Sequence, residues 1–381
     1  MTLRILHTSD WHLGRSLHEE PLLEDQALVL GQLVDLAREE RPDAVVVAGD
    51  VYDRAVPPAE AVALLDEVLV RLAELGVPVV AIAGNHDSPE RLSFAARLLA
   101  GRGVHLRADL RRAAEPVEIP GKGLVYAVPY LDPDLVRGIE GDEGIRGQAA
   151  AAERVVGRAR AHAAGRRLPA VLVAHAFVQG ALETPDSERP LSVGGAGSVP
   201  VAALAGFDYV ALGHLHAPQE VAPGVRYSGS LLKYSFAEAA HEKGALLVEV
   251  ERGAARARAV PLTARRDVVR LRGTLDELLR REDLARHAGD LVEATLDDPG
   301  YVVDAKAKLQ RRFRHVVNVV RAALVPGDEG EFAREVAGAG GDDQKLFRAF
   351  FERVAGGVPA PELQEVFAAA LREVQRKERA A

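Results

Sequence analysis

Short apolar runs alternate with amphipathic stretches at the start of the chain. Three runs are almost wholly apolar, which is typical of strands buried on both faces: residues 3–6, 44–48 and 77–83. Three stretches carry apolar side chains at helical spacing: residues 22–38, 58–75 and 91–100. Gly76 and Gly101 follow the second and third of these stretches, and we expect them to end the helices. This β-α-β-α order predicts a largely parallel sheet with helices on both faces.

A different pattern, with more scattered apolar runs, begins near residue 103. Extended segments are expected at residues 116–119, 123–129, 170–175, 225–227 and 245–250. A helix rich in alanine and arginine is expected over about 148–165, and residues 183–200 are expected to form an ordered loop. These segments predict an α/β fold with a two-layered β-sandwich core, flanked by helices. We place this first domain at residues 1–264.

The composition changes again beyond the sandwich. Apolar runs at 268–271, 291–296 and 316–320 alternate with helical stretches at 274–287 and 302–311. This pattern predicts a small, separate α/β domain over residues 265–325. Glycine and acidic residues follow and are typical of a linker, placed at 326–341. Two amphipathic C-terminal helices are expected within residues 342–381.

The C-terminal helices carry an apolar stripe that includes four phenylalanines. These are Phe347, Phe350, Phe351 and Phe367. Such a stripe is too large to remain comfortably in water. It either packs on the core of this chain or docks onto a partner by helix-in-groove recognition.

Composition and charge narrow the class of protein. Among the 381 residues there is no cysteine, so disulfides and thiolate metal sites are excluded. No apolar run approaches the roughly 18 residues of a membrane span, and the polar Asp10 follows the first run too soon for a signal peptide, so a cytoplasmic location is expected. The net charge of −8 disfavours non-specific wrapping of nucleic acid. Bound divalent ions or a partner subunit could still supply positive charge.

Polar side chains with metal-binding chemistry stand where several apolar runs end. They are Asp10, His12, Asp50, Asn85, His86, His175, His214 and His216. Ligands bind at strand ends in open α/β folds, because the loops there can direct several side chains at one point. Oxygen and imidazole ligands suit manganese, magnesium, iron or zinc. Each motif alone is weak, and His175 alone would be read as a core histidine. Together they exceed what one ion needs and predict an enzyme with two.

These motifs resemble those of the calcineurin-like metallophosphoesterase superfamily. The resemblance lies in Asp10-x-His12, Gly49-Asp50-Val51-Tyr52-Asp53, Gly84-Asn85-His86-Asp87, His175 and Gly213-His214-x-His216. Three further segments resemble one branch of the superfamily, the nuclease subunits that work with a coiled-coil ATPase: residues 10–15, 188–195 and 227–231. The resemblance covers essentially the whole chain.

The resemblance implies a role for each strand-end residue. Asp10, His12 and His216 would hold one ion, Asn85, His175 and His214 would hold the other, and Asp50 would bridge them. Mn²⁺ is the expected metal, with Mg²⁺ or Fe²⁺ as alternatives. Two ions about 3.5–4 Å apart can clamp a phosphodiester and generate a hydroxide near neutral pH.

His86 is expected to be a catalytic residue and not a primary ligand. It would touch the scissile phosphate or the leaving oxygen, as a general acid or as a stabilising cation. Asp53 would hold the His86 imidazole in the correct orientation, or alternatively cap the loop or pair with Arg54. Arg15, Arg54 and Arg189 flank the motifs, and each either contacts DNA phosphates or forms a surface ion pair.

The expected function is a metal-dependent DNA nuclease with double-strand exonuclease and single-strand or hairpin endonuclease activity. The resemblance implies a homodimer within a heterotetramer with the ATPase, a DNA-binding role for the small capping domain, and work in DNA end processing, repair, recombination and replication in the nucleoid. The alternative is a small-molecule phosphodiesterase or phosphatase of the same superfamily. The added domain and the C-terminal helices favour the nuclease, because a small substrate gives no reason for either.

Overall fold

The computed structural model describes residues 1–185, 197–300, 302–322, 342–355 and 357–378. The expected linker at 326–341 and the expected DNA contact Arg189 lie outside these ranges. The chain divides into two compact units, Met1–Val268 and Val269–Ala381. Within the described ranges, no helix has both the length and the apolar character needed to cross a membrane.

The first unit contains two six-stranded sheets. The first sheet has the order β16-β15-β1-β4-β5-β6. Its strands are β1 (Leu3–Thr8), β4 (Ala44–Val47), β5 (Val79–Ile82), β6 (Val104–Arg107), β15 (Gly244–Glu251) and β16 (Ala254–Pro261). Strands β1, β4, β5 and β6 run parallel, while β15 and β16 pair antiparallel. The predicted early strands are therefore confirmed, and they are closed at one edge by strands from far along the chain.

The second sheet has the order β13-β14-β12-β9-β8-β7. Its strands are β7 (Val117–Ile119), β8 (Gly123–Val128), β9 (Ala170–His175), β12 (Tyr209–Gly213), β13 (Gln219–Ala222) and β14 (Val225–Tyr227). Strands β8, β9, β12 and β14 are parallel, and the edge strands β7 and β13 are antiparallel. Two short pairs lie outside these sheets: β2 (Ser16–Leu17) with β3 (Glu20–Pro21), and β10 (Phe177–Val178) with β11 (Ser198–Val199).

The two sheets pack face to face around a shared apolar core. Ile5 and Val46 from the first sheet and Val171, Val173 and Ala211 from the second are buried in one cluster. Alternate side chains of a strand point to opposite faces, so the remaining apolar residues face the helices. The two-layered sandwich is confirmed.

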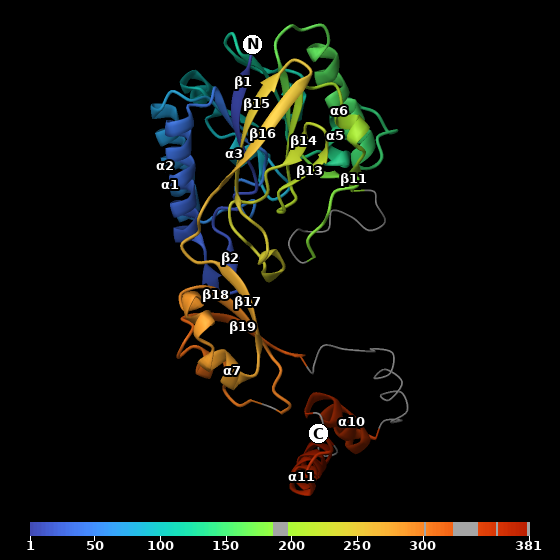
Figure 1. Ribbon diagram of the computed structural model, residues 1–381. Coiled ribbons are helices and arrows are strands. Elements are labelled where there is room, and N and C mark those ends of the chain that lie inside the picture. Colours follow the sequence, from blue (N-terminus) through green and yellow to red (C-terminus); the bar gives the residue numbers. More distant parts are fainter. Residues whose placement is uncertain (186–196, 301, 323–341, 356, 379–381) are drawn as a thin grey trace. The chain divides into compact units, whose positions relative to one another are not determined.

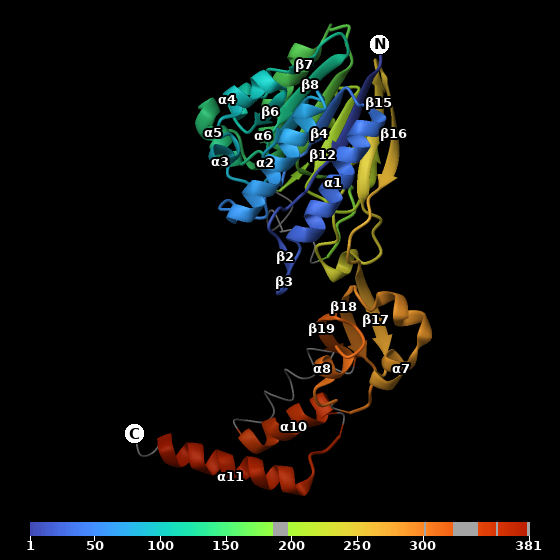
Figure 2. The same ribbon diagram turned by 90° about the vertical axis from the view of Figure 1, so that its left-hand side faces the viewer.

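Helices cover only the outer face of each sheet. These helices are α1 (Leu23–Glu40) and α2 (Ala59–Glu74) on one side, and α5 (Pro133–Glu140) and α6 (Gly147–Ala163) on the other. Figures 1 and 2 show the sheets between these two helical layers. The prediction of helices on both faces of the first sheet is wrong, because the second sheet covers its inner face.

The helix expected over residues 91–100 is interrupted. The chain forms α3 (Pro89–Leu92) and α4 (Ala96–Leu99) instead, and Ala95 between them has a φ of 57°. Ser88 caps the first piece by accepting a hydrogen bond from the Arg91 N–H. A 3₁₀ turn follows, and Gly103 (φ 81°) ends the segment where Gly101 was expected to do so.

The second unit contains the predicted small α/β element. A three-stranded sheet has the order β17 (Val268–Gly273), β18 (Leu291–Leu296) and β19 (His315–Arg321), and β18 and β19 are parallel. Helix α7 (Leu275–Arg280) begins with a capping box between Thr274 and Glu277, and α8 (Ala305–Leu309) follows β18. Both helices are shorter than expected, and residues 282–287 of the first expected stretch form a 3₁₀ helix. Leu278, Val292 and Phe313 lie in the core of this small α/β element.

The C-terminal segment forms the two expected helices, α10 (Asp343–Ala355) and α11 (Pro361–Glu378). They contact each other through stacked rings, with the centroids of Phe347 and Phe367 4.0 Å apart and the ring planes 8° apart. Phe351 lies beside Phe347, while Phe350 is exposed. Part of the apolar stripe is thus covered by the helix pair itself.

Candidate metal centre

The predicted metal-binding residues meet at the carboxyl ends of five parallel strands. They are Asp10 and His12 after β1, Asp50 after β4, Asn85 and His86 after β5, His175 at the end of β9, and His214 and His216 after β12. The ends coincide because β1, β4 and β5 are parallel in one sheet and β9 and β12 in the other. All of these side chains are buried except that of Asn85, which is half-buried. The structure therefore gathers residues from both layers at one point.

The backbone at this point adopts uncommon conformations that bring the sheets close together. Asp10, His12 and Asp50 have φ values between 44° and 51°, which non-glycine residues seldom adopt and which concentrate at functional sites. A Cβ on Gly49 would lie 2.4 Å from His175 Nδ1, and one on Gly213 would lie 1.9 Å from the Ala48 oxygen. Only glycine fits at these two positions.

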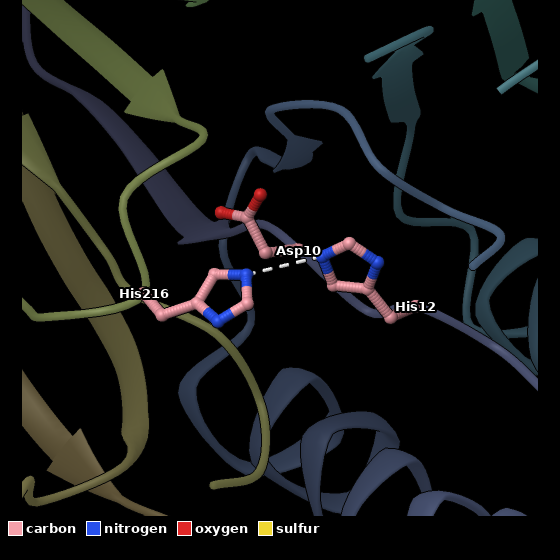
Figure 3. A group of neighbouring side chains, drawn as sticks. All are labelled: Asp10, His12 and His216. Atoms are coloured by element: carbon pink, nitrogen blue, oxygen red, sulfur yellow. Dashed lines mark hydrogen bonds between the residues drawn. The ribbon is translucent and has the colours of Figure 1, made fainter. Parts of the chain in front are cut away.

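The first group of side chains comprises Asp10, His12 and His216, shown in Figure 3. One ligand atom from each lies within 4.8 Å of those of the other two. The Nε2 atoms of His12 and His216 are 3.1 Å apart. Both oxygens of the Asp10 carboxylate accept from the His214 main-chain N–H at 3.1 Å, which fixes that carboxylate.

The second group comprises Asn85, His175 and His214. Asn85 Oδ1 lies 2.9 Å from His175 Nε2 and 3.2 Å from His214 Nδ1. His175 Nδ1 donates to the Ala48 main-chain oxygen at 2.8 Å, so the ring is held with Nε2 facing the site. An outer hydrogen bond of this kind is typical of metal-binding histidines.

Asp50 stands between the two groups. Its Oδ2 lies 3.7 Å from His12 Nε2 and 3.4 Å from His175 Nε2. Its Oδ1 accepts from the His86 main-chain N–H at 2.9 Å. Asp50 thus lies within reach of a histidine from each group, as a bridging ligand must.

Burial and mutual charge set the protonation of these residues. Burial lowers the pKa of His12 and of His214 to about 3, so both imidazoles are neutral at neutral pH. Burial alone would raise the pKa of Asp50, but His175 and His12 hold it well below its ordinary value. Burial likewise opposes the charging of His175, yet Asp50 raises the pKa of His175 to about 9. The ionised carboxylate of Asp50 is therefore stable in this buried place only with a positive charge nearby.

This donor set fits divalent cations. Imidazoles, an amide oxygen and carboxylates converge in a buried space. Metal ligands must be deprotonated to bind, and the imidazoles of His12 and His214 already are. Two buried Nε2 atoms only 3.1 Å apart are well placed to bind a shared cation. With imidazole and oxygen donors and no thiolate, the set suits a hard or borderline ion.

His86 lies at the same site, and its imidazole makes a contact that differs from the predicted one. His86 Nδ1 donates to the main-chain oxygen of Asp53 at 2.8 Å. The Asp53 carboxylate instead lies 3.5 Å from His12 Nδ1 and 3.4 Å from an Arg15 nitrogen. Asp53 therefore contacts His86 through its main-chain carbonyl and not through its carboxylate, because the loop after β4 turns that carbonyl toward the imidazole.

Two of the three predicted arginines lie near this loop. Arg15 is half-buried, pairs with Asp53 and stacks over the Tyr234 ring, with 5.2 Å between its guanidinium carbon and the ring centroid. Arg54 is exposed and only 4.0 Å from the other Asp53 oxygen. Each has a surface ion pair, and each also borders the site.

The structure adds residues that the sequence did not single out. Asp87 accepts the main-chain N–H groups of Val51, Tyr52 and Gly84 at 2.8–3.0 Å and so ties two site loops together. Its place in the Gly84–Asp87 motif is the sequence feature that could have identified Asp87 as part of the site. Glu238 lies 3.0 Å from His216 Nδ1, and no local pattern distinguishes it from surface glutamates.

Glu238 is charged although it is buried. Burial alone would raise the pKa of Glu238, but His216 and Lys243 hold it well below its ordinary value. Lys243 Nζ donates to Glu238 at 2.6 Å. A buried ion pair between Glu238 and Lys243 therefore lies directly behind His216.

Comparison with known proteins supports the geometry. A family model described as calcineurin-like phosphoesterase matches residues 3–218, which include every strand-end residue of the centre. The chain belongs to the calcineurin-like phosphoesterase family. It is accordingly a hydrolase of phosphoesters with a metal-binding cluster, and the predicted metallophosphoesterase fold is confirmed.

A second match covers the other unit. A model of the SbcD C-terminal type, described as Type 5 capsule protein repressor C-terminal domain, matches residues 264–355. Together the two matches support an SbcD-type nuclease subunit. A solved structure, that of TT1561 of Thermus thermophilus, is 16% identical and aligns over 68% of this chain and 99% of its own, with a TM-score of 0.41.

Proposed function

We propose that this calcineurin-like phosphoesterase is a DNA nuclease subunit that cleaves phosphodiester bonds with two Mn²⁺ ions. The observation that carries the proposal is a buried centre with two groups of ligands around Asp50, in a chain that also has an SbcD-type second unit. Asp10, His12 and His216 hold one ion, Asn85, His175 and His214 hold the other, and Asp50 contacts both. DNA ends and hairpins are the substrates, and DNA repair and recombination the setting.

The side chains of this site divide the work of phosphodiester hydrolysis. When bound, two divalent ions withdraw charge from phosphorus and lower the pKa of an attacking water. His86 supplies the group outside the ligand set. Because its Nδ1 donates to the Asp53 carbonyl, its Nε2 is left to face the substrate. The imidazolium form can donate from Nε2 to the scissile phosphate or the leaving 3′ oxygen.

Basic side chains supply candidate contacts to DNA. Arg15 at the rim of the centre is placed to contact a phosphate next to the scissile one, with Arg54 further out. In the second unit, Arg311 and Arg314 are exposed after α8 and have no ion-pair partner among the described residues. They support a DNA-binding role for residues 265–325, because phosphate contacts dominate DNA affinity.

A second copy of this chain is the proposed partner at α3 and α4. Phe94, in the turn between these two helices, is 82% exposed, and Leu98 on α4 is 80% exposed. Apolar side chains of this size favour burial against a like surface in a homodimer. Sedimentation velocity is expected to show a dimer for the full chain and a monomer for Leu98→Asp. A dimer in both cases would show that this surface is not the dimer interface.

The C-terminal helices are the proposed docking site for the coiled-coil base of an SbcC-type ATPase, giving a heterotetramer. Val366 on α11 is 65% exposed, and Phe350 and Val374 are also exposed, although Phe347 and Phe367 stack together. Val366→Asp in the full chain is expected to abolish co-purification with SbcC, because a charge would enter an apolar interface. Gln344→Asp, at an exposed polar position of α10, is the matched control. If Val366→Asp still co-purified with SbcC, that result would favour packing of these apolar side chains on this chain itself.

Cleavage of a labelled hairpin duplex tests the proposed function. With Mn²⁺, the full chain is expected to cut the hairpin, and SbcC with ATP is expected to increase the rate. Chelation of the metal should abolish the activity. Efficient hydrolysis of a small phosphodiester without DNA cleavage, with or without SbcC, would contradict the proposal and favour a small-molecule phosphodiesterase.

A further inference from the structure

We propose that Glu238 is a positioning residue of the metal centre, which holds His216 so that its Nε2 faces Asp10 and His12. The inference rests on the proposed two-metal function. Glu238 lies at the end of a 3₁₀ helix, Phe236–Glu238, outside the strand-end motifs. Its Oε1 is 3.0 Å from His216 Nδ1. A carboxylate without a proton can only accept, so His216 carries its proton on Nδ1.

That proton decides which nitrogen of His216 is available to a metal. With Nδ1 donating to Glu238, the lone pair lies on Nε2, the atom 3.1 Å from His12 Nε2. Figure 3 shows this nitrogen of His216 turned toward His12, with its other ring nitrogen pointing away. The contact therefore sets both the tautomer and the angle of the ring, as carboxylates behind metal-binding histidines do.

Lys243 and Ser230 hold the carboxylate in turn. Lys243 Nζ donates to Glu238 Oε2 at 2.6 Å, to the His216 main-chain oxygen at 2.8 Å and to Ser230 Oγ at 2.8 Å. Glu238 and Ser230 are fully buried, and Lys243 nearly so. One ammonium thus fixes both the backbone of His216 and the carboxylate on its ring. A buried carboxylate needs such a partner, because an unpaired buried charge is strongly unfavourable.

The double substitution Glu238→Gln with Lys243→Met tests the role without leaving one charge unpaired. Glutamine keeps the length of glutamate, methionine is one atom shorter than lysine, and together the two replacements remove the ion pair. The matched control is Glu220→Gln with Arg226→Met, which likewise removes an ion pair, here between the adjacent strands β13 and β14. Full-length proteins are titrated with Mn²⁺, free Mn²⁺ is followed by electron paramagnetic resonance, and thermal unfolding is measured without metal.

The parent and the control are expected to bind two Mn²⁺ ions. The Glu238/Lys243 double variant is expected to bind one ion with unchanged affinity and the other about 10- to 100-fold more weakly, with metal-free unfolding close to that of the parent. Two sites of parental affinity would overturn the inference. Equal weakening of both sites with a lower unfolding temperature would also overturn it, since that is the signature of a merely structural pair.

A second variant keeps the inference testable if the double variant does not fold. Glu238→Asp preserves the charge beside Lys243 but withdraws the carboxylate from His216 by one methylene. It is expected to weaken the same single site by a smaller factor, and parental affinity at both sites would overturn the inference. Absence of Mn²⁺ binding by the parent would instead overturn the proposed two-metal function itself, and the inference with it.

Discussion

Replacing His86 with alanine is expected to lower DNA cleavage by about 10²- to 10⁴-fold while both Mn²⁺ ions stay bound. The side chain lies outside the two ligand groups, and its Nδ1 is used by the Asp53 carbonyl. Its loss therefore removes a donor to the phosphate or the leaving oxygen and leaves the ligands in place. Single-turnover cleavage of a hairpin and Mn²⁺ titration of the same preparation measure the two quantities.

The control for His86 is His105→Ala. His105 lies on β6, at the edge of the first sheet, and its loss should leave both cleavage and binding unchanged. The competing role for His86 is that of a metal ligand, because its imidazole lies within 4.8 Å of ligand atoms of His12 and Asp50. If His86→Ala bound only one ion, His86 would be a ligand and its assignment as the catalytic donor would be wrong.

Asp50→Asn is expected to prevent two ions from binding at the same time. It is also expected to lower cleavage by more than about 10- to 100-fold, the loss typical when a residue that only positions a metal ligand is replaced. Asp50 is within reach of His12 and His175, one from each group. An amide has one oxygen and no charge, so it cannot serve both ions. Its oxygen can still accept the His86 N–H, and the loop should keep its shape.

The matched control is Asp35→Asn on α1, where the carboxylate is exposed and pairs with Arg38. It should bind two ions and cleave DNA at the parental rate. Two tightly bound ions in Asp50→Asn would contradict the bridging role, and one retained ion would be consistent with it. Mn²⁺ stoichiometry is therefore the deciding measurement, with the cleavage rate beside it.

The strand-end residues could be predicted from the sequence because each follows a short apolar run whose length and composition are typical of a buried strand. Runs such as 44–48 and 171–173 fix where a chain leaves the sheet, and Asp50 and His175 stand at those exits. Parallel pairing then brings the exits to one edge. Local pattern and sheet geometry are sufficient for this part of the site.

Other features depend on tertiary contacts that no local pattern contains. The second sheet, and not helices, covers the inner face of the first, because both have apolar side chains on that face. Asp53 is in the expected loop, but the turn there presents its carbonyl to His86. Glu238 reaches His216 across 22 residues of chain and depends on Lys243 for its charge. Such contacts follow only from the folded arrangement.

Anomalous diffraction from crystals grown with Mn²⁺ tests directly whether Asp50 bridges two ions. Two anomalous peaks about 3.5–4 Å apart are expected. One peak should be contacted by Asp10, His12 and His216, and the other by Asn85, His175 and His214, with the Asp50 carboxylate touching both. A single peak, or two peaks with Asp50 on only one of them, would contradict a bridged two-metal centre.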